Sequence, residues 1–123
     1  MGVSGYRRSV EGMDENSIAR AFFDSYTRAL LERDAGAVAS HYAVPCLIEF
    51  PDRAIAVSDM RQTEEFFTNA FAQYQGVTVA DAVVAVIAET RHSIWADVSW
   101  DHHGGAPDER NVYQLALTAD GWK

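Results

Sequence analysis

The order of the secondary-structure elements constrains the fold of this chain more than any single motif does. The sequence predicts, in order, a helix over 17–34, a short helix over 35–42, a strand, turn and strand over 47–57, a helix ending at Gly76, and three strands over 77–90, 92–103 and 111–118. Helices first and a long antiparallel sheet afterwards are typical of the α+β class. We therefore expect a curved antiparallel sheet wrapped around the N-terminal helices, a cone-shaped α+β barrel with a cavity inside.

Local signals set the bounds of these elements. Asp14 and Ser17 supply capping side chains for the first helix, and Asp59 with Gln62 forms a capping-box pattern before the third. We expect the third helix to bury one stripe, made of Met60, Thr63, Phe67, Ala70, Phe71 and Tyr74. The dipeptide Asp120-Gly121 is a hairpin-turn signal.

The first helix carries a tyrosine on its apolar face. Its helical spacing predicts an inward stripe of Ile18, Ala21, Phe22, Ser25, Tyr26, Ala29 and Leu30. The opposite face is predicted to hold Arg20, Asp24, Thr27 and Arg28. A buried phenol at Tyr26 is either a core residue with a satisfied hydroxyl or the polar floor of a pocket.

Composition limits the partners. The 123 residues fit one domain, which we place at 13–123 after a flexible leader at 1–12, and the turn at Asp120-Gly121 suggests that its last strand is cut off. A lone cysteine, Cys46, is expected to be a buried, inert thiol and suits a cytoplasmic protein. A net charge of −8 disfavours nucleic acid and anionic membranes as partners, and no apolar run is long enough to span a membrane.

Four segments together resemble the nuclear transport factor 2-like superfamily, which includes ketosteroid isomerases and SnoaL-like polyketide cyclases and has a cystatin-like fold. They are Ser25-Tyr26-Thr27-Arg28-Ala29-Leu30-Leu31-Glu32-Arg33-Asp34, Leu47-Ile48-Glu49-Phe50-Pro51, Glu65-Phe66-Phe67-Thr68-Asn69 and Ala96-Asp97-Val98-Ser99-Trp100-Asp101-His102-His103-Gly104. The superfamily holds enzymes and binding modules, so the resemblance implies the fold and leaves the activity open.

Matching the isomerase site residue by residue implies an incomplete catalytic set. Tyr26 matches the tyrosine that donates to the developing oxyanion, but Phe50 stands where the catalytic aspartate base would be. Tyr113 falls at the position of the protonated aspartate of the oxyanion hole. Phenylalanine cannot take a proton, so the isomerase route is expected to be absent, while a grip by two tyrosines stays open.

Strand alternation sorts the remaining candidate bases. If Ile48 and Phe50 face the cavity, Glu49 faces away from it, and the central strand sends Trp100 and His102 inward. His102 is then either a catalytic or ligand-orienting group or a plain rim histidine. His41 is expected to cap the second helix. Neighbours on a strand point to opposite faces, so His102 and His103 are not expected to share a metal ion, and we expect no metal and no cofactor.

Two tryptophans indicate a contact surface. Trp95 is predicted on the outer face of the sheet, and Trp122 lies close to the last turn. Large aromatic side chains on an outer sheet face often belong to protein interfaces, so we expect a homodimer through this face.

These observations leave three functional hypotheses. The first is a domain with an apolar pocket that binds a small hydrophobic or cyclic molecule, lined by Phe22, Tyr26, Ile48, Phe50, Phe67, Phe71, Val98, Trp100 and Tyr113. The second is a cofactor-independent isomerase, cyclase or dehydratase with Tyr26 and Tyr113 as donors and His102, or less favourably Glu49, as base. The third is a dimeric interaction module whose cavity is filled by its own side chains.

Overall fold

The computed structural model describes residues 14–104 and 108–123, so the leader predicted at 1–12 lies outside the described residues. The elements are α2 (Glu15–Leu31), α3 (Ala35–Ala39), β1 (Cys46–Phe50), β2 (Arg53–Val57), α4 (Met60–Ala70), the 3-10 helix η1 (Phe71–Tyr74), β3 (Asp81–Thr90), β4 (Ser93–Asp101), β5 (Glu109–Thr118) and β6 (Gly121–Trp122). This order confirms the predicted α+β class. No helix among the described residues is long and apolar enough to cross a membrane.

Side-chain caps start the helices. Asp14 accepts a hydrogen bond from the Ser17 amide at the start of α2, and Asp34 accepts one from the Ala37 amide at the start of α3. At α4 the predicted capping box of Asp59 and Gln62 is present. The predicted burial of Met60 is wrong, because this first residue of α4 is 44% exposed.

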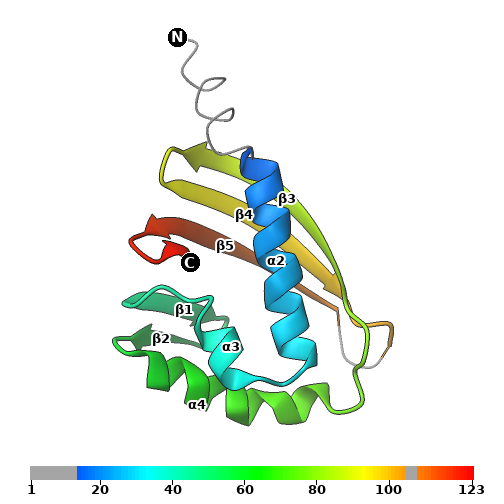
Figure 1. Ribbon diagram of the computed structural model, residues 1–123. Helices are drawn as coiled ribbons and strands as arrows, with labels where there is room; N and C mark the ends of the chain where they lie inside the picture. The colour runs from blue at the N-terminus through cyan, green and yellow to red at the C-terminus, as the bar shows by residue number, and fades with distance from the viewer. Residues whose placement is uncertain (1–13, 105–107) are drawn as a thin grey trace.

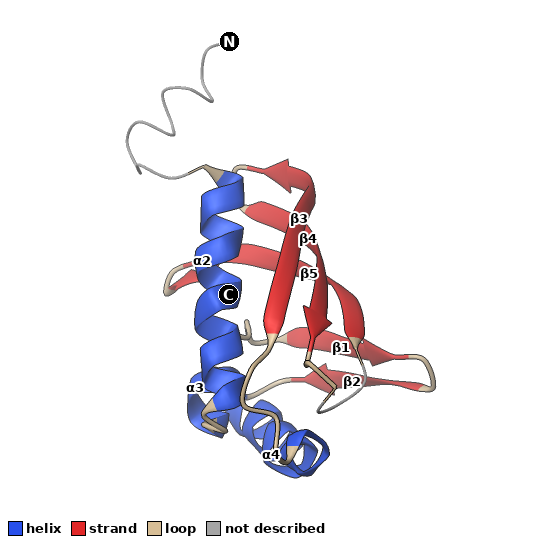
Figure 2. Cartoon of the chain, turned by 90° about the vertical axis from the view of Figure 1, so that its right-hand side faces the viewer, coloured by secondary structure: helices blue, strands red, loops and turns tan. Residues whose placement is uncertain are grey.

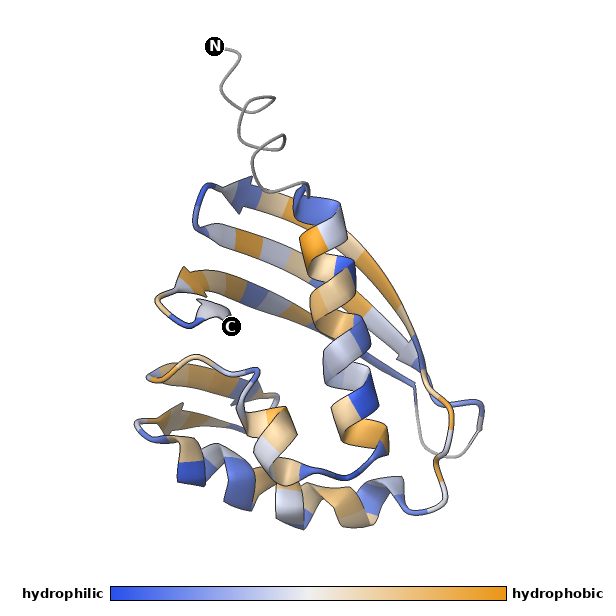
Figure 3. Cartoon of the chain, viewed as in Figure 1, coloured by the Kyte–Doolittle hydropathy of each residue, from blue (hydrophilic) through white to orange (hydrophobic). Residues whose placement is uncertain are grey.

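The main sheet is antiparallel in the order β3-β4-β5-β6, and it curls around α2, which lies along its concave side (Figures 1 and 2). A bulge between Val86 and Ala88 shifts the register of β3 against β4 and favours local bending. Buried and more exposed residues alternate along most of β4, whereas β3 is apolar along most of its length (Figure 3). The inward row of β4, Ile94, Ala96, Val98 and Trp100, is at most 5% exposed.

The buried face of α2 differs from the predicted stripe. Ala19, Phe23, Tyr26, Thr27 and Ala29 are its buried residues, whereas Ser25 is exposed. The buried face of α2 is therefore rotated toward Phe23 and Thr27 relative to the predicted face. The helical pattern predicts Thr27 on the solvent face. It is buried instead, because α2 packs against β4, the strand that carries Trp100.

The hairpin of β1 and β2 forms a separate small sheet. Within the described residues no strand pairing joins it to the main sheet, although β1 lies on the side of the hairpin nearest β5 (Figure 1). The short β6 pairs with Leu117 and Thr118 of β5, and Lys123 exchanges backbone hydrogen bonds with Ala116. The rest of β5 and the facing edge of β1 are therefore not paired with each other, and they border a gap between the two sheets.

Candidate functional site

A cleft of about 1320 Å³ lies between the β1–β2 hairpin, α2, α4 and β5. Every residue of β1 (Cys46–Phe50) lines it, and so do the consecutive residues 111–116 of β5. Successive strand residues point to opposite faces, so a cleft that touches all of them follows the strand edges. The cleft therefore runs through the gap between β1 and β5 and reaches both faces of the wall.

Most of the pocket residues predicted from the sequence line this cleft, namely Phe22, Tyr26, Ile48, Phe50, Phe67, Trp100 and Tyr113. Two do not. Val98 is fully buried in the core cluster, and Phe71 packs against that cluster from η1. Val98 is one pleat away from Trp100 on the same face of β4, but the core covers it completely.

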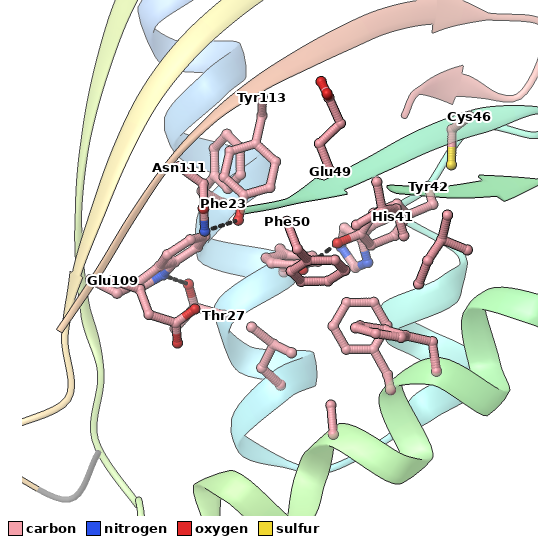
Figure 4. Close-up of a pocket in the computed structure, with 18 of the residues that line it drawn as sticks. Phe23, Thr27, His41, Tyr42, Cys46, Glu49, Phe50, Glu109, Asn111 and Tyr113 are labelled. Carbon is pink, nitrogen blue, oxygen red and sulfur yellow. Dashed lines mark hydrogen bonds between the residues drawn. The ribbon is translucent and has the colours of Figure 1, made fainter. Parts of the chain in front are cut away.

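Glu49 has the orientation that strand alternation predicts. Its side chain is exposed and points away from Phe50 on β1 (Figure 4), as alternation requires. It nevertheless lines the cleft, because the cleft passes along the edge of β1 and is not confined to the face of Phe50. The predicted outward orientation of Glu49 therefore holds, although the edge of the cleft reaches this residue.

Tyr26 and Tyr42 form the polar centre of the cleft. Their hydroxyl oxygens are 2.6 Å apart, so one phenol donates to the other. Tyr113 comes from β5, and its hydroxyl accepts a hydrogen bond of 3.3 Å from the Asn111 side-chain amide. The rings of Tyr26 and Tyr113 are 6.4 Å apart and nearly perpendicular.

Burial keeps these phenols neutral. It raises the pKa of Tyr26 well above the ordinary value, and the neighbouring phenols of Tyr42 and Tyr113 raise it further. Burial likewise raises the pKa of Tyr42 and of Tyr113. All three side chains therefore act as hydrogen-bond donors or acceptors and are poor proton acceptors at neutral pH.

His41 makes the capping contact predicted for it and one contact that was not predicted. Its Nδ1 lies 2.7 Å from the Ala37 carbonyl, which only accepts, so Nδ1 carries the proton. In the neutral ring Nε2 then accepts the Ser25 hydroxyl proton at 2.9 Å. The imidazole also packs edge-on against the rings of Phe22 and Tyr26, so it fixes the α2–α3 junction beside the tyrosines.

A second polar cluster lies in the same cleft and consists of Tyr74, His102 and Glu109. The Tyr74 hydroxyl donates to Glu109 Oε1 at 2.5 Å, and His102 Nε2 lies 3.1 Å from the same oxygen. His102 is 7% exposed, which agrees with its predicted inward orientation, and its Nδ1 is buried without a hydrogen-bond partner among the described residues. His103 points elsewhere and lies 2.7 Å from Asp81.

Sequence reasoning missed Tyr42, Tyr74 and Glu109. Alternation along β5 gave one usable signal, since Glu109, Asn111 and Tyr113 fall on one face. Tyr42 follows α3, where helical periodicity has ended.

Cys46 is less enclosed than expected. It is only partly buried and lines the cleft, although burial still raises its thiol pKa.

No protein-family model matches the sequence, and no curated protein sequence matches it either. Solved structures do match. A domain of unknown function with a cystatin-like fold from Nostoc punctiforme is 16% identical with a TM-score of 0.67, over 89% of this chain and 72% of that one. A ketosteroid isomerase-like protein from Erwinia carotovora atroseptica is 16% identical with a TM-score of 0.57, over 85% of each chain.

A third solved structure, a cystatin-fold protein from Novosphingobium aromaticivorans, is 11% identical with a TM-score of 0.54, over 83% of this chain and 90% of that one. At such identities the likeness concerns the backbone alone. The chain has the nuclear transport factor 2-like, cystatin-like fold that its segments resemble.

Proposed function

We propose that this domain binds a small, largely apolar cyclic or aromatic molecule in the cleft, and that the Tyr26–Tyr42 pair and Tyr113 hold a carbonyl or hydroxyl oxygen of that molecule. The observation that carries the proposal is the phenol–phenol hydrogen bond at the centre of an aromatic-lined cleft. Cofactor chemistry is not needed for this role.

Counting protons explains why the pair suits an oxygen atom. Each phenol has one proton, and only one of the two protons is used in the Tyr26–Tyr42 bond. The other remains for a ligand, and the first bond polarises it. Tyr113 accepts from Asn111, so its own proton is also available. A ligand acceptor would thus meet phenolic donors from two sides.

The cleft wall supports an apolar ligand. Phe22, Phe50, Phe66, Phe67 and Trp100 line the cleft around the phenols. Small-molecule sites commonly combine such apolar walls with a few placed polar groups. The volume also argues against the interaction module with a self-filled cavity, because its side chains do not close the cleft.

The competing function is a cofactor-independent isomerase, cyclase or dehydratase. The observation in its favour is that His102 lies in the same cleft as the tyrosines, held by Glu109. Against it, Phe50 occupies the wall where the isomerase resemblance requires a base, and Glu49 points away from Phe50. Loss of turnover in His102→Ala with ligand binding retained would favour the enzyme over the binding domain.

A thermal-shift screen with cyclic ketones, phenols, lactones and sterol-like compounds tests the proposal. A ligand at about 100 times its dissociation constant adds about 2.7 kcal/mol to the free energy of unfolding. For a domain of this size that raises the melting temperature by several degrees. We expect hits whose shift falls in Tyr26→Phe and in Tyr42→Phe.

Ser99→Ala is the matched control, since it removes a hydroxyl from the outward face of β4 and leaves the cleft intact. It should keep the wild-type shift. Hits that are insensitive to both tyrosine substitutions would refute the phenol anchor. The absence of any hit across the panel would refute small-molecule binding.

A further inference from the structure

The carboxylate of Glu109 is the starting point. Glu109 opens β5, Tyr74 ends η1 and His102 follows β4, so three separate elements fix one carboxyl group. Both hydrogen bonds that the Glu109 carboxylate makes within the described residues end on Oε1. Oε2 is thus left to accept from another molecule, and the Glu109 side chain is 37% exposed in the cleft.

Among residues 14–104 and 108–123, Glu109 has no permanently charged partner. Within the described residues its ionic contact is with His102, and it forms no salt bridge with an arginine or lysine. Arg33 lines the same cleft and contacts Tyr74, but its guanidinium donates to the carbonyl oxygens of Leu31, Tyr74 and Val77. A carboxylate in a partly enclosed cleft is stabilised by an opposite charge.

Aromatic side chains lie close to Glu109, since Tyr74 donates to its carboxylate and Trp100 is its cross-strand partner on β4. Tyr74 packs edge-on against His102 with ring centroids 5.5 Å apart, and Trp100 and Tyr113 meet at 5.6 Å. Glu109 also contributes to the raised pKa of Tyr113, after burial and Tyr42, which indicates that the two groups are close. Aromatic faces attract cations, and one ring of this cleft already does so: Arg53 lies 5.4 Å from the centroid of Phe50.

We propose that Glu109, held by Tyr74 and His102, binds a protonated amine, so that the ligand class of the cleft is a cyclic or aromatic amine whose ring lies against Tyr113 and Trp100. The inference rests on the proposed function, because it requires that the cleft takes a small molecule. The two hydrogen bonds on Oε1 fix the carboxylate before binding, so little of its freedom is lost when the amine arrives.

Matched pairs of probes test the amine directly. We would measure the affinities of tryptamine and phenethylamine, and of the corresponding alcohols indole-3-ethanol and 2-phenylethanol, by titration calorimetry at neutral pH. The alcohols keep the ring and the chain and lack the charge. Wild-type protein should bind each amine at least about tenfold more tightly than its alcohol, and Glu109→Gln should bring the ratio close to one.

Two further variants keep the result interpretable. Glu65→Gln makes the same substitution on the exposed face of α4, outside the cleft lining, and should keep the wild-type ratio. Glu109→Asp keeps the charge but shortens the side chain, and it should keep part of the preference, so a folding defect in Glu109→Gln alone does not decide the outcome. The melting temperature without ligand reports the folding of each variant.

The outcomes separate this inference from the function on which it rests. Equal affinity for amines and alcohols in wild-type protein, or a preference that survives in Glu109→Gln, would overturn the amine site. If neutral cyclic ketones still bind, and bind more weakly to Tyr26→Phe, the proposed function stands without the amine site. If neither probe series nor the ketones bind at millimolar concentration, both proposals fail.

Discussion

The hydrogen bond between Trp100 and Thr27 joins the sheet to α2 at a single pair of atoms. The indole Nε1 donates to Thr27 Oγ1 at 3.2 Å, and both side chains are at most 9% exposed. Thr27→Val keeps the shape and removes the acceptor, so it should lower the free energy of unfolding by about 1–3 kcal/mol. Urea unfolding measures this loss.

Thr27→Ser is the matched control for that substitution. It keeps the hydroxyl and removes one methyl group, which costs about 0.8 kcal/mol of burial. Thr27→Val should therefore be the less stable of the two variants. Equal stability of Thr27→Val and wild type would mean that the indole finds another acceptor.

The buried phenols predict a loss of stability in alkali. Tyr26, Tyr42, Tyr74 and Tyr113 all have a folded-state pKa above the ordinary value, with burial as the main cause. Above about pH 10 the unfolded chain releases these protons while the folded chain keeps them. Above pH 10 each phenol should therefore lower the free energy of unfolding by about 1.4 kcal/mol per pH unit, until its folded-state pKa is reached. Below about pH 10 the stability is fully present.

Absorbance at 295 nm and near-ultraviolet circular dichroism check the alkaline prediction together. The phenolate signal of these four tyrosines should appear with the loss of tertiary structure. If all of the tyrosine signal appeared near pH 10 in a protein that stays folded, the phenols would not be buried as described.

Single residues differed in how well the sequence predicted them. Helical spacing placed Tyr26 inside, because a helix of this length has a well-defined apolar face. The same pattern omitted Phe23 and placed Thr27 outside, because the tilt of α2 against β3 and β4 decides which side of a broad apolar face is central. Tyr42 depends on tertiary contacts and carries no local signal, whereas for Glu109 the alternation along β5 gives its face but not its partners.

At the scale of elements, Arg33 connects α2 to the segment after η1. It adopts a positive φ of 53° just after α2, and its guanidinium donates to the carbonyl oxygens of Leu31, Tyr74 and Val77. This contact holds Tyr74, and therefore the Glu109 cluster, in place. Lysine has one ammonium group and cannot span three acceptors in a fixed plane.

Arg33→Lys should therefore lower the free energy of unfolding by about 1–2 kcal/mol, since the part-buried carbonyl acceptors lose hydrogen bonds, although the Tyr74 carbonyl keeps its bond from the Val77 amide. Chemical denaturation measures the change. Arg61→Lys is the control, because Arg61 is an exposed residue of α4 outside the cleft. If both variants unfold at the same denaturant concentration, Arg33 does not join the two elements.

Elements with a capping signal were predicted best. Asp14, Asp59 and the Asp120-Gly121 turn each mark an observed boundary. The third helix was not predicted in detail, because α4 ends at Ala70 and the chain continues as the 3-10 helix Phe71–Tyr74. That change of helix type shifts Phe71 and Tyr74 out of the straight α-helical stripe that begins at Thr63.

At the scale of the whole molecule, the gap beside β5 predicts an alternating pattern of amide exchange. The Ala116 amide donates to Lys123 on the β6 side, whereas the Leu117 amide donates to His92 on the β4 side. Antiparallel strands alternate in this way along their length. The amides of Arg110, Val112 and Gln114 should therefore exchange quickly, and those of Asn111, Tyr113 and Leu115 slowly.

Hydrogen exchange followed by nuclear magnetic resonance resolves these amides one by one. The β4 amides serve as the internal reference, because β4 has a paired strand on each side. Uniform protection along β5 would show that its open edge is covered in solution.

We also propose that a second copy of this chain covers the outer face of the sheet. Trp95, Val83 and Val112 project from β4, β3 and β5 and are 42%, 70% and 57% exposed. Light scattering at micromolar concentration should give the mass of a dimer. Trp95→Glu and Val83→Glu should each shift it toward the monomer, because a charge on an apolar interface is costly. A wild-type monomer under these conditions would exclude the dimer.

The overall architecture followed from element order, but the cleft did not. Hydrophobic patterning specifies which face of a strand is buried and carries no information about which edges stay unpaired. The cleft follows the edges of β1 and β5, so Glu49 lines it although its pattern assigned it to the outside.

The gap between β1 and β5 also affects the time for which a ligand stays. Entry along two strand edges needs no lid to open, so neither association nor release waits for a conformational step of the kind that limits many enzymes. With an association rate constant of about 10⁷ M⁻¹s⁻¹, a ligand of about 10 µM affinity would leave within about 10 ms. Such a domain would follow changes in ligand concentration almost instantly and would store very little of it.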